Sequence, residues 1–243
     1  MKKIGLFEAF GVELEYMIVD KESLRVLPIT DKILETLAGT ITDEVLNGKI
    51  SWSNELALHV IELKTTSPVP DLAGLDNHFL ENIHQINQIA ASWGGMLMPT
   101  AMHPFMNPEK EMKLWPHGYN EVYAKYDEIF ECKGHGWSNL QSVHLNLPFR
   151  NDDEFAKLHA AIRAILPLLP ALAASSPIQE GKLTGFQDTR LEVYRFNQKR
   201  VPEIVGDIIP EPVFSQAEYE EKILQKIYRA VASFDPEGIL QEE

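Results

Sequence analysis

Residues 10–19 alternate between two kinds of side chain, and this alternation constrains the fold more than any other feature of the sequence. One set is apolar and comprises Val12, Leu14, Tyr16 and Ile18. The other set comprises Gly11, Glu13, Glu15 and Met17. Successive side chains of a strand point to opposite faces, so the pattern predicts a strand with one face on a hydrophobic core. Strands of a parallel sheet are apolar on both faces, and the polar face therefore favours an antiparallel sheet with one open side.

The rest of the chain predicts helices and further strands in alternation. We expect helices over residues 31–38, 72–93, 120–130, 152–174 and 216–233. We expect strands over residues 55–66, 96–102 and 142–149. Pro167 and Pro170 should bend or break the helix that contains them. The segment 175–212, dense in Gly, Pro, Arg and Asp, is expected to be a functional loop region with short strands. With no repeat or convincing linker, the pattern predicts an α+β fold in a single domain over residues 1–243.

Charge and cysteine content limit the partners and the compartment. The 22 basic and 36 acidic residues give a formal net charge of −14, so we expect no nucleic-acid partner. The longest apolar stretch, residues 162–174, is interrupted by Arg163 and two prolines, and we expect no membrane span. A single cysteine, Cys132, excludes an internal disulfide, and the first residues lack a signal-peptide pattern. We therefore expect a cytoplasmic protein.

Two carboxylates stand out on the first predicted strand. Glu13 and Glu15 are two residues apart, so both point to the same face. Adjacent carboxylates repel each other unless water or a cation screens them. The pair is therefore either part of a solvent-exposed face or part of a site for a hard divalent cation, which prefers oxygen ligands.

A second acidic pair has a spacing that does not fit an unbroken strand. Glu55 and Glu62 are seven residues apart, so a continuous strand would place them on opposite faces. Either Glu55 lies in the loop before the strand, or a β-bulge resets the alternation. Both alternatives leave Glu62 between apolar neighbours.

Two further segments carry polar side chains of chemical interest. Ser142, His144 and Asn146 alternate with apolar residues, so a strand would present them as one row opposite an apolar face. His144 is either a hydrogen-bonded structural residue or a ligand of a metal or phosphate group. Five cations within residues 182–200 need anionic partners, either internal acids or a bound phosphate or carboxylate: Lys182, Arg190, Arg195, Lys199 and Arg200. The glycine spacing there matches neither a P-loop nor a dinucleotide fingerprint.

Taken in order, these segments resemble the glutamate–cysteine ligase family, and within it the bacterial carboxylate–amine ligase branch. The matching segments are residues 10–16, 55–66, 101–105, 141–146 and 173–190, and the resemblance spans most of residues 8–215. The resemblance implies a fold similar to that of glutamine synthetase, with a curved antiparallel sheet and helices on its outer face.

The resemblance also implies a reaction and a set of site residues. Members of the family use ATP and Mg²⁺ to activate a glutamate-like carboxylate as an acyl phosphate, which an amine then attacks. The expected metal ligands are Glu13, Glu15, Glu55, Glu62 and His144. The expected catalytic residues are Lys182 and Arg190, and the expected nucleotide-binding residues are Lys182, Arg190, Arg200 and Asn146. The expected partners are small-molecule amino acid and amine substrates.

The chain departs from the family at its C-terminal end. Members of the family continue into further strands, whereas this chain stops at Gln241-Glu242-Glu243, so we expect a C-terminally truncated domain with an incomplete sheet. Two alternatives to a ligase therefore stay open: a non-catalytic relative that binds nucleotide or metal, and a phosphotransferase of the same superfold. Homo-oligomerisation and the identity of the amine also stay open.

Overall fold

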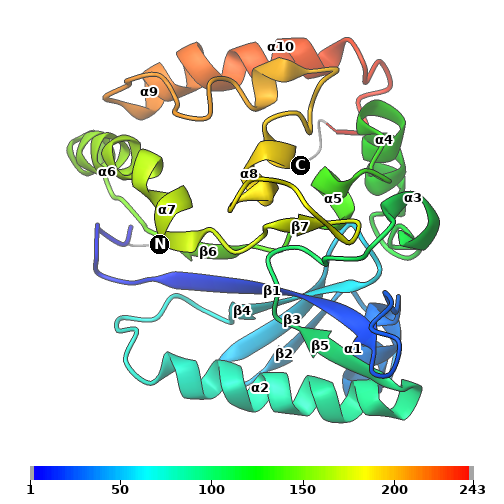
Figure 1. Cartoon of the computed structure of the whole chain (residues 1–243). Coiled ribbons are helices and arrows are strands. Elements are labelled where there is room, and N and C mark those ends of the chain that lie inside the picture. The colour runs from blue at the N-terminus through cyan, green and yellow to red at the C-terminus, as the bar shows by residue number, and fades with distance from the viewer. Residues whose placement is uncertain (1–2, 241–243) are drawn as a thin grey trace.

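One antiparallel sheet organises the described part of the chain, residues 3–240 of the computed structural model (Figure 1). Its strands are β1 (Gly11–Asp20), β2 (Glu44–Asn47), β3 (Ile50–Asn54), β4 (Val60–Thr65), β5 (Gly95–Met98) and β6 (Val143–Asn146). The strand order is β2-β3-β4-β1-β5, and β6 also pairs with β1. Strand β1 is thus central, with β4 along one edge and both β5 and β6 along the other. The predicted α+β class and antiparallel sheet are confirmed.

One face of the sheet packs on two helices, α1 (Thr30–Ala38) and α2 (Leu75–Ala90), which lie side by side below it (Figure 1). The apolar set of β1 faces this layer, as the alternation predicts. The core between the layers includes Ile18, Trp52, Ile61, Leu63, Phe79 and Ile86. Trp52 is fully buried, and its indole N–H donates to Asn82 Oδ1 of α2 at 2.7 Å. This layer is therefore a closed hydrophobic core.

The opposite face of the sheet is covered at one end and polar at the other. A second apolar cluster includes Met17 and Val19 of β1, Val60 of β4 and Ile129 of α4 (Asn120–Phe130). Two short helices, α3 (Pro108–Glu111) and α5 (His135–Ser138), lie on the same side as α4 (Figure 1). The end of β1 that carries Glu13 and Glu15 lies outside this cluster.

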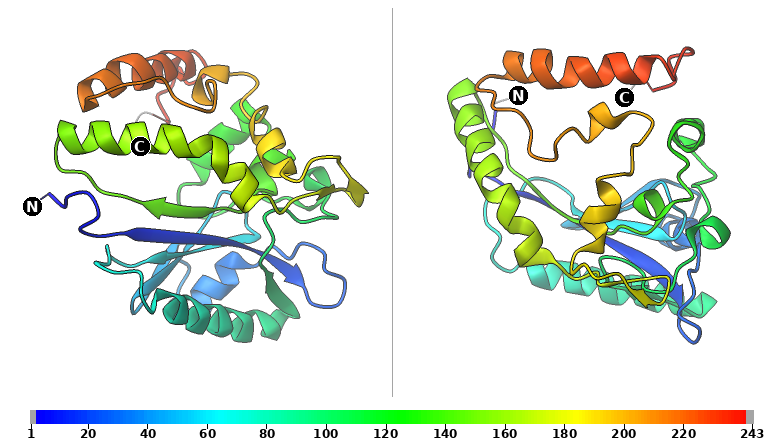
Figure 2. Two further views of the ribbon diagram at one scale, coloured as in Figure 1. Left: turned by 60° about the vertical axis from the view of Figure 1, so that its left-hand side comes forward. Right: turned by 45° about the horizontal axis from the view of Figure 1, so that its top comes forward.

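A further set of helices lies above the sheet, away from α1 and α2 (Figure 2). It comprises α6 (Asp152–Ile165), a 3-10 turn (Leu166–Leu168), α7 (Leu169–Ala173), α8 (Thr189–Tyr194), a 3-10 turn (Pro202–Ile204), α9 (Gln216–Tyr219), a π-helical turn (Glu220–Leu224) and α10 (Gln225–Ala232). A small hairpin of β7 (Ile178–Gln179) and β8 (Lys182–Leu183) lies between α7 and α8 in the sequence. The predicted break near Pro167 is confirmed by the 3-10 turn that contains it.

Several strands differ from the prediction, each for a physical reason. The strand predicted over residues 55–66 begins only at Val60, and Glu55 lies in the preceding loop. Strands β5 and β6 are shorter than predicted because they share one edge of β1: β5 pairs with residues 17–20 and β6 with residues 11–14. The hairpin of β2 and β3 was not predicted.

The outer side of β6 also differs from expectation. Val143 and Leu145, which the alternation places on the apolar face of this strand, are 71% and 53% exposed. The expected truncation concerns Gln241–Glu243, which lie outside the described residues, and it stays a prediction.

One helical stretch among the described residues, Asp152–Ala173, is long and apolar enough to cross a membrane by length and composition alone. It joins α6, the 3-10 turn and α7, and only 11% of its apolar window is buried. Arg163 and the two prolines nevertheless interrupt it, as the sequence indicates. Because length and composition are weak evidence, the expectation of no membrane partner stays a prediction.

Candidate metal and nucleotide site

The register of β1, β4 and β6 brings the predicted acidic residues and His144 onto one patch of the polar sheet face. Glu13 lies opposite His144 of β6 and opposite Lys64 of β4. Glu15 lies opposite Glu62 of β4. Residues in register on neighbouring antiparallel strands have side chains about 5 Å apart on the same face. Glutamates separated by almost 50 residues in sequence are therefore neighbours in the fold.

These side chains form two groups that could each hold a metal ion. The first group is Glu13, Glu62 and His144, and the second is Glu15, Glu55 and Glu62. Within each group, one ligand atom from every residue lies within 4.8 Å of the others. Glu62 belongs to both groups, so an ion in either group would use its carboxylate. The five residues brought together are the five that the sequence predicts as metal ligands.

Glu13 is held by two side chains from β6. His144 Nδ1 lies 2.7 Å from Glu13 Oε2, and Asn146 Nδ2 donates to Glu13 Oε1 at 2.7 Å. Partial burial raises the pKa of Glu13, but the hydrogen bonds from His144 and Asn146 outweigh burial and leave the pKa below its usual value. Glu13 is therefore a carboxylate at neutral pH, as a metal ligand must be.

Glu15 is oriented by Ser142, which directly precedes β6. The backbone N–H of Ser142 donates to Glu15 Oε2 at 3.0 Å, and its hydroxyl donates to Glu15 Oε1 at 2.6 Å. Ser142 Oγ also lies 3.0 Å from His144 Nε2. The polar row of Ser142, His144 and Asn146 thus fixes Glu13 and Glu15.

Glu55 enters the same patch from the loop that joins β3 to β4. Burial raises the pKa of its carboxyl group, and the nearby Glu15 and Glu62 raise it further, to about 8. A pKa above neutral is expected where burial and two nearby acids outweigh the one nearby cation, Lys64. A divalent cation would stabilise the ionised form of all three.

Glu62 is buried, with an exposed fraction of 8%, and it has partners that the sequence analysis missed. Ser53 of β3 donates to Glu62 Oε2 at 2.9 Å, and Lys64 Nζ lies 3.1 Å from the same oxygen. Lys64 Nζ also donates to Ser53 Oγ at 3.0 Å. Lys64 follows Glu62 by two residues on one strand, so the two side chains lie on the same face. This spacing in the sequence indicates the ion pair.

The donor set fits magnesium. Four carboxylates and one imidazole meet on one face, and hard divalent cations prefer oxygen ligands. A cavity of about 340 Å³ opens beside the patch. Its polar lining includes Glu13, Lys64 and Asn146, and its apolar lining includes Ile4, Phe10, Leu147 and Pro148. A nucleotide or substrate could therefore lie next to the acidic patch.

The predicted basic residues are less closely tied to this patch. Arg190 of α8 is the nearest by contact, because its Nη1 donates to the Gln141 carbonyl at 2.6 Å, one residue before Ser142. Arg200 donates instead to the carbonyls of Glu128 and Ile129 at 2.8 and 3.0 Å, near the end of α4. Lys182 is exposed on β8, and no contact joins it to the acidic residues within the described chain. Their catalytic and nucleotide-binding roles stay predictions.

Cys132 is not a reactive group in this fold. It is fully buried, and burial together with Asp127 raises the pKa of its thiol to about 12. A thiol of that pKa is protonated at neutral pH and is a poor nucleophile.

A family model and several named relatives indicate one family. The family model described as glutamate–cysteine ligase family 2 matches residues 9–229. An uncharacterized protein of Archaeoglobus fulgidus is 40% identical over 218 residues, which cover 90% of this chain and 58% of that protein. A protein of Rubrobacter xylanophilus named "Putative glutamate–cysteine ligase 2-1" is 26% identical over 189 residues, which cover 76% of this chain and 46% of that protein.

A third relative is also matched over about half of its own length. A protein of Bradyrhizobium diazoefficiens named "Putative glutamate–cysteine ligase 2" is 26% identical over 223 residues, which cover 88% of this chain and 46% of that protein. The chain thus spans about half the length of the curated relatives that it matches.

Proposed function

The chain belongs to glutamate–cysteine ligase family 2, and from that premise we propose that it takes part in an ATP- and Mg²⁺-dependent ligation of a glutamate-like carboxylate to an amine. We assign its sheet to the glutamine synthetase type. The observation that carries the proposal is the convergence of Glu13, Glu15, Glu55, Glu62 and His144 into two groups of ligand atoms on the open sheet face.

The chemistry of such a ligation explains why acids are needed at an anion-binding site. A substrate carboxylate oxygen attacks the γ-phosphorus of ATP, the bond to the β-phosphate oxygen breaks, and ADP and an acyl phosphate result. An amine then attacks the acyl carbon, the carbon–oxygen bond to phosphate breaks, and an amide, phosphate and one proton are released. When bound, magnesium supplies the positive charge that lets these anions approach one another.

The residues of the chain have distinct tasks in this proposal. The carboxylates of Glu13, Glu15, Glu55 and Glu62 and the imidazole of His144 would hold the metal. Ser142, Asn146 and Ser53 orient those groups by the hydrogen bonds described above. Arg190, anchored beside Ser142, is the best placed of the predicted cations to hold a phosphate or carboxylate group.

The proposal is tested by measuring ADP release from ATP. We expect release only when Mg²⁺, glutamate and an amine are present together, and we expect Glu13→Gln to reduce it by at least about 100-fold because a metal ligand is lost. The matched control is Glu35→Gln, which removes an exposed carboxylate from α1 on the other side of the sheet. Full activity in Glu13→Gln would remove Glu13 from the proposed metal set.

The same assay separates the two alternatives. ATP binding by calorimetry without amine-dependent turnover would replace the ligase with a non-catalytic relative. Release of ADP together with a stable phosphoramidate, and no amide, would replace it with a phosphotransferase.

A further inference from the structure

One basic residue beside the acidic patch, Lys64, is absent from the set of site residues that the sequence predicts. It lies on β4 two residues after Glu62, so both side chains are on the polar sheet face. Its side chain is 32% exposed, and it lines the cavity of about 340 Å³ that opens beside the patch. Lys64 therefore borders both the proposed metal ligands and the space in which a nucleotide could lie.

The charges of this cavity come from two residues. Among the described residues that line it, Lys64 carries the only positive charge and Glu13 the only negative charge. The rest of the lining is apolar or neutral, and it includes the hydroxyl-bearing residues 65–67. None of the cations predicted from residues 182–200 belongs to the lining. Within the described chain, an anionic group in the cavity could therefore form an ion pair only with Lys64.

The ammonium group of Lys64 is held by Glu62. Lys64 Nζ lies 3.1 Å from Glu62 Oε2 and donates to Ser53 Oγ at 3.0 Å. It also lies 3.7 Å from Glu44 Oε1 of β2, but that carboxylate is 46% exposed, and such surface pairs contribute little. Glu62 is buried and is therefore the main partner. In this arrangement Glu62 offsets the charge that Lys64 could offer to a ligand.

Glu62 cannot serve Lys64 and a divalent cation equally well. It shares the first group of ligand atoms with Glu13 and His144. A cation in that group would repel the nearby ammonium group, and the flexible stem of a lysine allows the ammonium group to move away. The same cation would offset the charge of Glu13, the acid of the cavity. One binding event would thus free the cation of the cavity and neutralise its anion.

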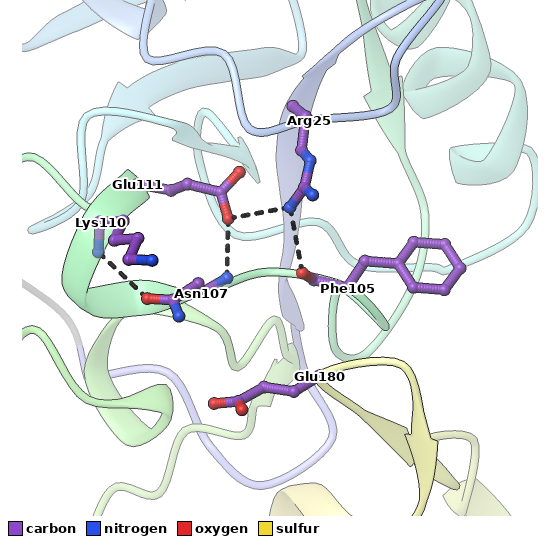
Figure 3. A pocket seen from close by; sticks show the side chains of 6 residues that line it. All are labelled: Arg25, Phe105, Asn107, Lys110, Glu111 and Glu180. Atoms are coloured by element: carbon purple, nitrogen blue, oxygen red, sulfur yellow. Dashed lines mark hydrogen bonds and ion pairs between the residues drawn. The ribbon is translucent and has the colours of Figure 1, made fainter.

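A larger cavity, of about 530 Å³ beside the turn after β1, provides a contrast. Arg25 Nη1 lies 3.6 Å from Glu111 Oε2 and donates to the Phe105 carbonyl at 3.4 Å (Figure 3). Glu111 belongs to neither group of metal-ligand atoms. That ion pair is therefore not linked to the acidic patch, whereas the pair of Lys64 and Glu62 is part of it.

We propose that Lys64 binds a phosphate group of the nucleotide in the cavity beside the acidic patch, and that it is released to do so when a divalent cation replaces it at Glu62. The inference rests on the proposed binding of ATP and Mg²⁺, and it names a phosphate-binding residue outside the basic cluster of residues 182–200. Lys64 thereby links occupation of the metal site to nucleotide affinity.

The phosphate contact is tested by calorimetry with ADP at saturating Mg²⁺. Lys64→Met should weaken ADP binding at least about tenfold, because a charge-assisted hydrogen bond is lost, and Lys64→Arg should restore most of the affinity. Lys32→Met on α1 is the matched control and should bind as the parent chain does. Thermal melts of the variants show whether folding is intact. Equal ADP affinity in the parent chain and a folded Lys64→Met variant, or no ADP binding by the parent chain at millimolar concentration, overturns the proposal.

The release of Lys64 is tested by the same titration in EDTA. The parent chain and Lys64→Met should then bind ADP with nearly equal affinity, because Glu62 holds Lys64. Glu62→Gln should strengthen ADP binding at least about threefold by freeing the ammonium group, and the double variant Glu62→Gln/Lys64→Met should lose this gain. A gain that persists in the double variant would come from removal of the Glu62 charge alone and would overturn the release.

These affinities separate the role of Lys64 from the proposed ligation. If ADP affinity follows this pattern but ADP release never depends on an amine, the ligation is contradicted and the role of Lys64 stands. If ligation is observed and Lys64→Met binds ADP as the parent chain does, the role of Lys64 is contradicted and the ligation stands.

Discussion

The two layers on either side of the sheet differ in how much of their apolar surface is buried. Below the sheet, α2 alone buries Leu75, Phe79, Asn82, Ile86 and Ala90. Above it, no residue of α7, α9 or α10 is buried. In the stretch around α7, Leu168, Leu169 and Leu172 are 59%, 44% and 80% exposed.

This difference bears on the site, because its parts lie on different layers. The acidic residues stand on strands whose other face is the closed core, so their geometry is set by the most stable part of the fold. The predicted basic residues lie on the other side of the sheet: Lys182 and Arg190 on the hairpin and α8, and Arg200 near the end of α4 beside the second apolar cluster. The lower layer therefore holds the proposed metal ligands in position. The upper layer carries the predicted basic residues that would bind anionic groups.

The largest effect is expected from the lower core. Trp52→Ala should lower the free energy of unfolding by about 3–5 kcal/mol, because it leaves a cavity under the sheet and removes the hydrogen bond to Asn82. Denaturant unfolding followed by circular dichroism measures this loss. A change below about 1 kcal/mol would contradict the view that this layer sets the stability of the fold.

The pH dependence of stability should report on the acidic patch. Glu55 has a folded-state pKa of about 8 and an ordinary value of 4.5. Its stabilising effect is complete below its unfolded pKa and is lost as pH rises through about 8, by at most about 1.4 kcal/mol for each pH unit. Thermal melts in EDTA between pH 6 and pH 9 should therefore show falling stability, and Glu55→Gln should flatten the profile. An identical slope in both proteins would show that Glu55 is not the titrating group.

A smaller effect, on metal affinity, is expected from Lys64. Its positive charge neutralises Glu62 when no metal is bound. Lys64→Met should raise the affinity for Mn²⁺ about three- to tenfold, because a positive charge next to the metal ligands is removed. Electron paramagnetic resonance of free Mn²⁺ measures the affinity directly, and Lys32→Met on α1 is the control. Weaker Mn²⁺ binding in Lys64→Met would mean that Lys64 positions Glu62 rather than competing with the ion.

The smallest effect is expected on the upper layer. Leu172→Ser should change the free energy of unfolding by no more than about 0.5 kcal/mol, since its side chain is 80% exposed. The same denaturant titration as for Trp52→Ala provides the comparison. A loss of 2 kcal/mol or more would show that the two layers are equally important for stability.

Periodicity predicts the lower layer, whereas the convergence of the acidic patch is implied by the resemblance to the glutamate–cysteine ligase family. Alternation in β1 defines its two faces, and the stripe of α2 defines the side that covers the core. Alternation places Glu13 and Glu15 on one face, and only the resemblance groups them with His144. The odd spacing of Glu55 and Glu62 is explained by the loop position of Glu55.

What the sequence did not predict depends on pairing between distant segments. Strands β5 and β6 are short because both pair with the same edge of β1. This arrangement depends on strand register, which the local sequence pattern does not give. The partnership of Ser53 with Glu62 depends on the pairing of β3 with β4, which places these two residues in register. The contacts of Arg200 with the end of α4 have no signal in the spacing of the basic cluster.

We propose that the two groups of ligand atoms on the open sheet face, which have Glu62 in common, bind divalent cations. Mn²⁺ titration of the parent chain, followed by electron paramagnetic resonance, should reveal two bound ions. Glu62→Gln should weaken both by at least about tenfold, whereas Glu35→Gln should weaken neither. Parent-like binding of both ions by a folded Glu62→Gln variant would contradict the claim.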